Sequence, residues 1–172
     1  VIIIVFTYIN LRGIREVGAI STVLSFCVLV AFAAVAVVGF AKWNYNPMEP
    51  FIPEGSSLLG SVGGSLAIGM WMYSGYTAMS TLGGEIKDKS LIPKGLMIIL
   101  PLTMLSYVLP TIAGLASVGQ WENWSTSDGI SFGHVLGLVG SWGIPAFFIV
   151  AVLANLSIFN TYIISISRGF FA

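Results

Sequence analysis

Residues 70–95 read MWMYSGYTAMSTLGGEIKDKSLIPKG, and their character changes from one end to the other. The stretch begins as apolar as a membrane helix and then fills with serine, glycine, threonine and tyrosine before its first charge, Glu85. In hydrocarbon every backbone N–H and C=O group must be paired, so an interrupted helix persists only where it faces protein or a water-filled cavity. The stretch therefore predicts a helix that is broken within the bilayer near Gly75.

The composition of the whole chain is that of a membrane protein. Of its 172 residues, 56% are hydrophobic and only 8% are charged, and the mean hydropathy is +0.95. A soluble domain of this length carries far more charge. We expect an all-α, polytopic membrane helix bundle. The first residues, 1–9, form an apolar run without a basic segment before it, so they do not resemble a signal peptide, and both ends are interpreted as cuts through a larger protein.

Apolar stretches of the right length predict the membrane spans, because a bilayer core of about 30 Å needs roughly 20 apolar residues in a helix. The predicted spans, within a single transmembrane domain over 1–172, are 1–9 (partial), 17–41, 57–83, 96–119 and 144–168. A shorter run with helical spacing, 131–140, predicts an interfacial helix before the last span.

The basic residues give these spans an orientation. If the spans cross alternately, Lys42 lies on one side and the other six basic residues lie on the opposite side, namely Arg12, Arg15, Lys87, Lys89, Lys94 and Arg168. Short loops rich in lysine and arginine stay cytoplasmic. We therefore expect loops 10–16 and 84–95 to be cytoplasmic in an integral, multi-pass protein of the cell membrane.

Few residues of this chain offer catalytic or metal-binding chemistry. The single cysteine, Cys27, excludes an internal disulfide, and the single histidine, His134, leaves no histidine–cysteine metal cluster in the sequence. The sequence also contains no motif for nucleophilic or metal-assisted catalysis. We expect no enzyme activity, no metal site, no cofactor and no nucleic-acid partner.

The polar run over 73–81 bears on function. Many secondary transporters bind solutes at discontinuous helices, where free N–H groups attract a carboxylate and free carbonyls attract an ammonium group or a cation. This reading favours a secondary active transporter. The alternative is a structural or regulatory multi-span protein, whose helices would be continuous and whose polar groups would lie on helix contacts.

Three motifs in order resemble the amino acid/polyamine/organocation (APC) superfamily of permeases. Residues 73–76 (YSGY), followed by 84–87 (GEIK) and Ile92-Pro93, resemble its sixth transmembrane segment and the next loop. Residues 10–18 (NLRGIREVG) resemble the loop before its fifth segment, and Asn160 with the ending 167–172 (SRGFFA) resembles its eighth. The order of the motifs, which cover essentially the whole chain, makes the resemblance specific.

The resemblance implies a LeuT-type fold of two inverted five-helix repeats, of which this chain holds roughly the end of segment four to segment eight. It implies a permease for amino acids or related small amines that works with the remaining transmembrane segments of the full-length protein in the lipid bilayer. The substrate would bind at the broken part of the 57–83 span. The residues that the resemblance places at this site are Tyr73, Ser74, Gly75, Tyr76 and Thr77.

Two departures from the family pattern bear on the substrate and the coupling ion. Thr77 stands where many members carry a glutamate, and this favours a neutral amino acid. The 17–41 span lacks the lysine that serves some members as a cation substitute, so coupling to protons or to sodium stays open.

Two residues of the last span complete the candidate site. Exposing the amide of Asn160 to lipid costs free energy, so this side chain must face protein or the solute pathway. It therefore either lines the site or bonds to another helix. Phe159 is a candidate gate by its position alone.

Overall fold

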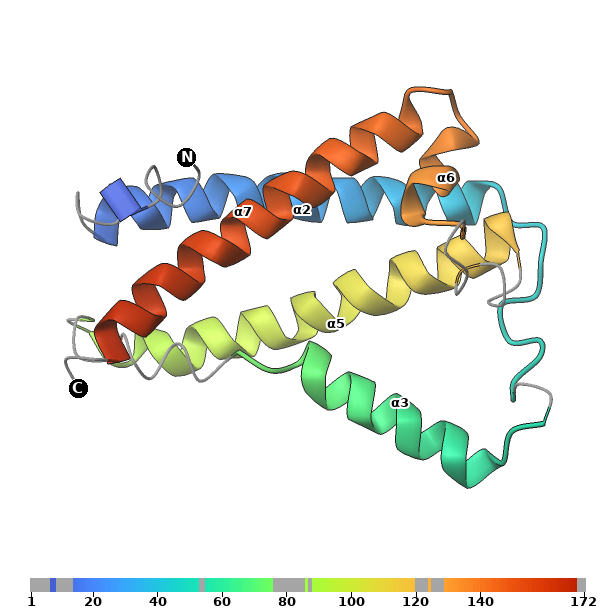
Figure 1. Cartoon of the computed structure of the whole chain (residues 1–172), viewed down its shortest axis with the longest axis horizontal. Helices are drawn as coiled ribbons and strands as arrows, with labels where there is room; N and C mark the ends of the chain where they lie inside the picture. The colour runs from blue at the N-terminus through green and yellow to red at the C-terminus, as the bar shows by residue number, and fades with distance from the viewer. Residues whose placement is uncertain are drawn as a thin grey trace.

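The computed structural model of this chain describes residues 7–8, 14–52, 55–75, 86, 88–119, 124 and 129–169. Within these ranges the regular structure is helical and contains no strand, as predicted for an all-α bundle. Figure 1 shows the helices in chain order: α2 (Ile14–Ala41), α3 (Leu58–Met72), α5 (Leu91–Val118), α6 (Phe132–Gly137) and α7 (Gly143–Gly169).

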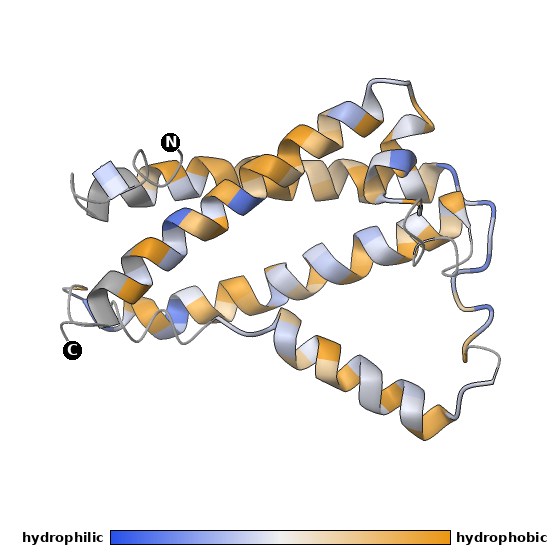
Figure 2. Cartoon of the chain, in the orientation of Figure 1, coloured by the Kyte–Doolittle hydropathy of each residue, from blue (hydrophilic) through white to orange (hydrophobic). Residues whose placement is uncertain are grey.

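Three of the described helices are long and apolar enough to cross a membrane. The qualifying stretches are Gly18–Ala41 of α2, Leu91–Val118 of α5 and Gly143–Ile163 of α7. Figure 2 shows hydrophobic residues along all three, with a few hydrophilic positions within α5 and α7 and further hydrophilic residues in the connection that follows α2. α5 begins at Leu91 rather than at residue 96, because Pro93 falls in the first helical turn, where its missing N–H group costs nothing.

Hydrogen bonds between Ser90 and Asp88 stabilise the turn before α5. The hydroxyl group of Ser90 and its backbone N–H both donate to the carboxylate of Asp88, with 2.9 Å between Ser90 N and Asp88 Oδ1. These two bonds hold the pKa of Asp88 below its ordinary value. These bonds favour the ionised form of Asp88, whose negative charge lies just ahead of the helix N-terminus, where it is favourable.

The packed core lies where α2, α5, α6 and α7 meet. Val35 of α2 and Val135 and Leu136 of α6 are buried there against partly buried neighbours from α5 and α7. The ring of Phe132 lies 5.7 Å from that of Phe32 and 5.3 Å from that of Trp124, both in edge-to-face contact. α6 is therefore packed among the three long helices.

The end of α2 is fastened to α5 by small residues and backbone bonds. A Cβ atom added at Gly39 would lie 2.5 Å from the carbonyl oxygen of Ala113, which means that the two backbones are nearly in contact. Just beyond α2, the backbone N–H groups of Asn44 and Tyr45 donate to the carbonyl of Ala116, at 2.8 and 2.9 Å. These contacts set how closely α2 and α5 approach at this end.

α3 is shorter than the predicted span over 57–83. It begins after Ser57, whose hydroxyl oxygen accepts the N–H of Gly60 at 3.1 Å. Its 15 residues extend about 22 Å, at 1.5 Å per residue, which is less than the hydrocarbon core of a bilayer. In Figure 1 the helix slants away from the bundle and its C-terminal end lies nearest to α5.

Candidate functional site

The end of α3 is the feature from which the site is built. After Met72 the backbone N–H of Tyr73 donates to Gly69 O at 3.0 Å, and that of Ser74 donates to Trp71 O at 3.1 Å. Gly75 then adopts a φ of +101°, a left-handed conformation that glycine reaches without strain and that ends a helix. The helix thus stops just before the glycine at which the sequence predicts a break. Residues 76–85 lie outside the described residues.

A pocket of about 370 Å³ lies beside this interrupted end. Its volume is in the range of sites for small molecules. The wall is formed by residues of α2, α5 and α7 together with the end of α3: Ser25, Met72, Ser74, Gly75, Thr103, Tyr107, Ser157, Ile158, Thr161, Tyr162 and Ser165. Eight of these eleven residues carry a hydroxyl group, so the pocket is uncharged but rich in hydrogen-bonding groups.

The predicted site residues fall into three groups. Ser74 and Gly75 line the pocket, and the ring of Tyr73 packs edge-to-face on that of Tyr107 in its wall, with 5.7 Å between centroids. Phe159 and Asn160 are not among the described residues that line it. Tyr76 and Thr77 lie outside the described part of the chain.

Asn160 makes a contact between two helices. Its side chain is fully buried, and its Nδ2 donates to the hydroxyl oxygen of Ser21 on α2 at 3.0 Å. Of the two roles that the sequence leaves open for Asn160, this geometry corresponds to the helix–helix hydrogen bond.

Several pocket residues were not predicted as site residues, although the sequence carries a signal for some of them. Thr161 and Ser165 are spaced four apart, and so are Thr103 and Tyr107, which places each pair on one face of its helix. Ser25 lies four residues after Ser21 on α2, but this spacing does not show which helix the pair faces. Only the packing of α2, α5 and α7 brings these three faces around one pocket.

The hydroxyls of Ser165 and Thr161 differ in whether they have a hydrogen-bond partner. Thr161 Oγ1 donates to the carbonyl of Ser157 on its own helix at 3.0 Å. Ser165 Oγ is buried and has no hydrogen-bond partner among the described residues. A buried hydroxyl in that state costs about 1–3 kcal/mol. A small rotation of its side chain toward the pocket would allow a bound molecule or water to offset this cost.

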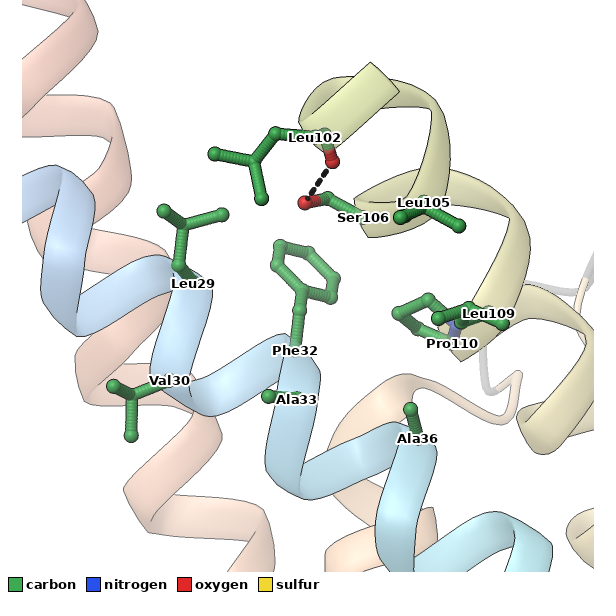
Figure 3. A pocket seen from close by; sticks show the side chains of 10 residues that line it. All are labelled: Leu29, Val30, Phe32, Ala33, Ala36, Leu102, Leu105, Ser106, Leu109 and Pro110. Atoms are coloured by element: carbon green, nitrogen blue, oxygen red, sulfur yellow. Dashed lines mark hydrogen bonds between the residues drawn. The ribbon is translucent and has the colours of Figure 1, made fainter. Parts of the chain in front are cut away.

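A second pocket, between α2 and α5, has different chemistry. Figure 3 shows its wall of leucine, valine, phenylalanine and alanine side chains, which enclose about 390 Å³. The hydroxyl of Ser106 in this wall donates to the carbonyl of Leu102 on its own helix at 2.7 Å, the dashed line in Figure 3. This pocket therefore presents apolar surface, and the hydroxyl-lined pocket is the candidate site.

The Asn160–Ser21 contact leads to a prediction about stability. Asn160→Ala should lower the free energy of unfolding by about 1–2 kcal/mol, because it leaves a small cavity and removes the hydrogen bond between α7 and α2. Unfolding in mixed detergent micelles would measure this. The control is Asn155→Ala, since Asn155 is exposed and its Nδ2 donates to Ala151 O of its own helix at 2.8 Å. Equal losses for the two variants would contradict the assignment.

The profile of a protein family described as "Amino acid permease" matches residues 1–172 of the chain. A probable polyamine transporter of Arabidopsis thaliana is 26% identical over 146 residues, which cover 83% of this chain and 28% of that protein. A second polyamine transporter of the same plant is 26% identical over 164 residues, or 92% of this chain and 32% of that protein.

A bacterial protein is similar to the same extent. An arginine/agmatine antiporter of Chlamydia trachomatis serovar D is 24% identical over 145 residues, or 81% of this chain and 30% of that protein. The chain spans about 30% of the length of these relatives. No solved structure matches the chain.

Proposed function

Because this chain belongs to the amino acid permease family, we propose that the protein is a secondary active transporter of amino acids or related small amines. The family and the similar proteins are permeases and transporters rather than enzymes. The family match and the three long apolar helices both indicate that the chain is part of an integral, multi-pass membrane protein. In the proposed orientation, loops 10–16 and 84–95 face the cytoplasm.

The substrate binds, in this proposal, in the pocket at the interrupted end of α3. The observation that carries it is the meeting of that helix end with hydroxyl groups from three other helices. Helix C-termini present carbonyl oxygens and a partial negative charge, which attract an ammonium group. The surrounding hydroxyls can donate to a carboxylate. A zwitterionic amino acid offers both groups to the same small site.

A neutral amino acid is the proposed substrate, although the relatives are named for polyamines and for arginine and agmatine. The polar side-chain groups in the pocket wall are hydroxyls, which bind a zwitterion through hydrogen bonds without adding charge. The family resemblance adds that Thr77 stands where many members carry a glutamate. An extra ammonium group buried without a carboxylate partner costs several kcal/mol. Tyr76 and Thr77, by the same resemblance, belong to this site.

The test is uptake by the full-length protein reconstituted in proteoliposomes. The panel should pair neutral amino acids with arginine, agmatine and a polyamine, each with and without proton and sodium gradients. We expect uptake of a neutral amino acid that exceeds uptake of the cations, driven by one of the two gradients. Uptake of the cations alone would refute the neutral substrate. No uptake of any solute would favour the structural or regulatory alternative.

A further inference from the structure

We propose that Tyr107 is a positioning residue that sets the geometry of the interrupted end of α3. The inference rests on the proposed function of the pocket, because the role of Tyr107 would be to hold Ser74 and Gly75 where they contact a bound solute. It adds to that site a residue from another helix, which the sequence motifs do not include.

Tyr107 contacts the end of α3 in two ways. Its phenol group donates to the carbonyl oxygen of Met72, the last residue of α3, with 3.4 Å between the oxygens. Its ring packs edge-to-face on that of Tyr73, the residue that ends the helix, with 5.7 Å between centroids and 80° between planes. One side chain of α5 thus holds two consecutive residues at the point of interruption.

The hydrogen bond matters because of where the Met72 carbonyl lies. The last four carbonyls of a helix lack partners within the helix, and an unpaired carbonyl in a membrane is costly. The carbonyls of Gly69 and Trp71 accept N–H groups from Tyr73 and Ser74. The carbonyl of Met72 accepts a hydrogen bond from the phenol of Tyr107, which lies on α5.

Neighbouring hydroxyls on α5 behave differently. Those of Ser106 and Thr111 donate to carbonyls of their own helix, both at 2.7 Å. Such bonds satisfy the hydroxyl without connecting α5 to anything else. The phenol of Tyr107 instead joins α5 to α3.

The length of the hydrogen bond between Tyr107 and Met72 indicates that a bound solute could replace it. At 3.4 Å it is longer than the 2.5–3.0 Å typical of an O–H···O bond, so it is weak. Tyr107 also lines the pocket. A solute ammonium group that reaches the Met72 carbonyl therefore competes with the phenol, which can then donate to a solute carboxylate. Tyr107 in this way links occupancy of the pocket to the position of the helix end.

The experiment compares Tyr107→Phe, which removes only the hydroxyl, with Ser106→Ala, which removes a hydroxyl one residue away. The first measurement, on the full-length protein, is the rate at which a methanethiosulfonate reagent modifies Ser74→Cys, in a background that also carries Cys27→Ala and lacks other reactive cysteines. The second measurement is the KM and maximal rate of uptake, in the protein with Ser74 intact.

We expect Tyr107→Phe to raise the modification rate about twofold, the factor for the loss of a weak hydrogen bond. It should raise KM by a similar factor and leave the maximal rate unchanged. Ser106→Ala should change neither quantity. Tyr107→Leu, which also removes the ring contact, should change both more than Tyr107→Phe does.

An unchanged modification rate and an unchanged KM in Tyr107→Phe would overturn the inference. If that variant is also less stable to heat, Tyr107 is a packing residue only. If the parent protein transports nothing, the modification rate still decides the role of Tyr107, and the proposed function fails separately.

Discussion

Gly75→Val should abolish most solute uptake while the protein remains folded in the membrane. Gly75 has a φ of +101°, and a β-branched side chain is strained there by about 1–3 kcal/mol. No described atom lies within 4 Å of a Cβ built on Gly75, so the strain comes from the backbone rather than from crowding. The turn relieves it by changing conformation, and this moves Ser74 away from its place in the pocket wall. We expect the uptake rate to fall at least tenfold, roughly the factor for 1.4 kcal/mol.

The measurement is initial uptake in proteoliposomes, normalised to the amount of folded protein. Gly69→Val is the matched control, because Gly69 lies in the regular part of α3 and also has no described atom within 4 Å of a built Cβ. Gly75→Asn should be milder than Gly75→Val, since asparagine tolerates left-handed backbone better. Wild-type uptake by Gly75→Val would show that the left-handed turn has no role in transport.

Gly39→Leu should prevent α2 from packing on α5 and so cause loss of folded protein. A Cβ at this position would lie 2.5 Å from the carbonyl oxygen and 2.7 Å from the Cβ of Ala113, which is itself fully buried. These are atoms of the backbone or directly attached to it, so they cannot rotate away as the end of a long side chain can. Overpacking a core costs about 1–3 kcal/mol for small additions. Four added carbon atoms at a backbone contact should exceed the upper end of that range.

The yield of monodisperse protein after detergent extraction, together with thermal unfolding, would measure this effect. Gly18→Leu is the matched control, because Gly18 is an exposed residue of the same helix with no described atom within 4 Å of a built Cβ. Gly39→Ala should be intermediate, since one methyl group requires a smaller displacement of α5. Equal yields for Gly39→Leu and Gly18→Leu would contradict the close approach of α2 and α5.

The candidate site divides into a part that could be predicted and a part that could not. Ser74 and Gly75 were predicted because the local sequence weakens the helix there and the family resemblance places both residues at the site. Tyr107 and Ser25 were not predicted, because α5 and α2 carry hydroxyl-bearing residues on more than one face and the sequence does not show which face meets the pocket. In soluble proteins the polar face of a helix shows which face is buried. In a membrane, lipid and protein interior are equally apolar, so the sequence carries little information about which face meets another helix.

Asn160 and α6 illustrate the same limit. The sequence requires that Asn160 be paired, since lipid offers it no partner, but cannot show whether the partner is a solute or Ser21. α6 has helical spacing in the sequence, but only the structure shows that Gly133, Val135 and Leu136 are buried among the long helices. In both cases the deciding contact comes from a residue far away in the chain.

The sequence by itself determined that this is an all-α membrane protein, approximately where its long helices run, and that the backbone changes direction near Gly75. These properties depend on apolar length and on local backbone preferences, which are encoded within a few consecutive residues. Only the tertiary structure decided that hydroxyls of α2, α5 and α7 surround the end of α3, that Tyr107 holds Met72, and that Asn160 bonds to Ser21. Those contacts depend on how each helix is rotated about its own axis, and close packing of small residues such as Gly39 sets that rotation.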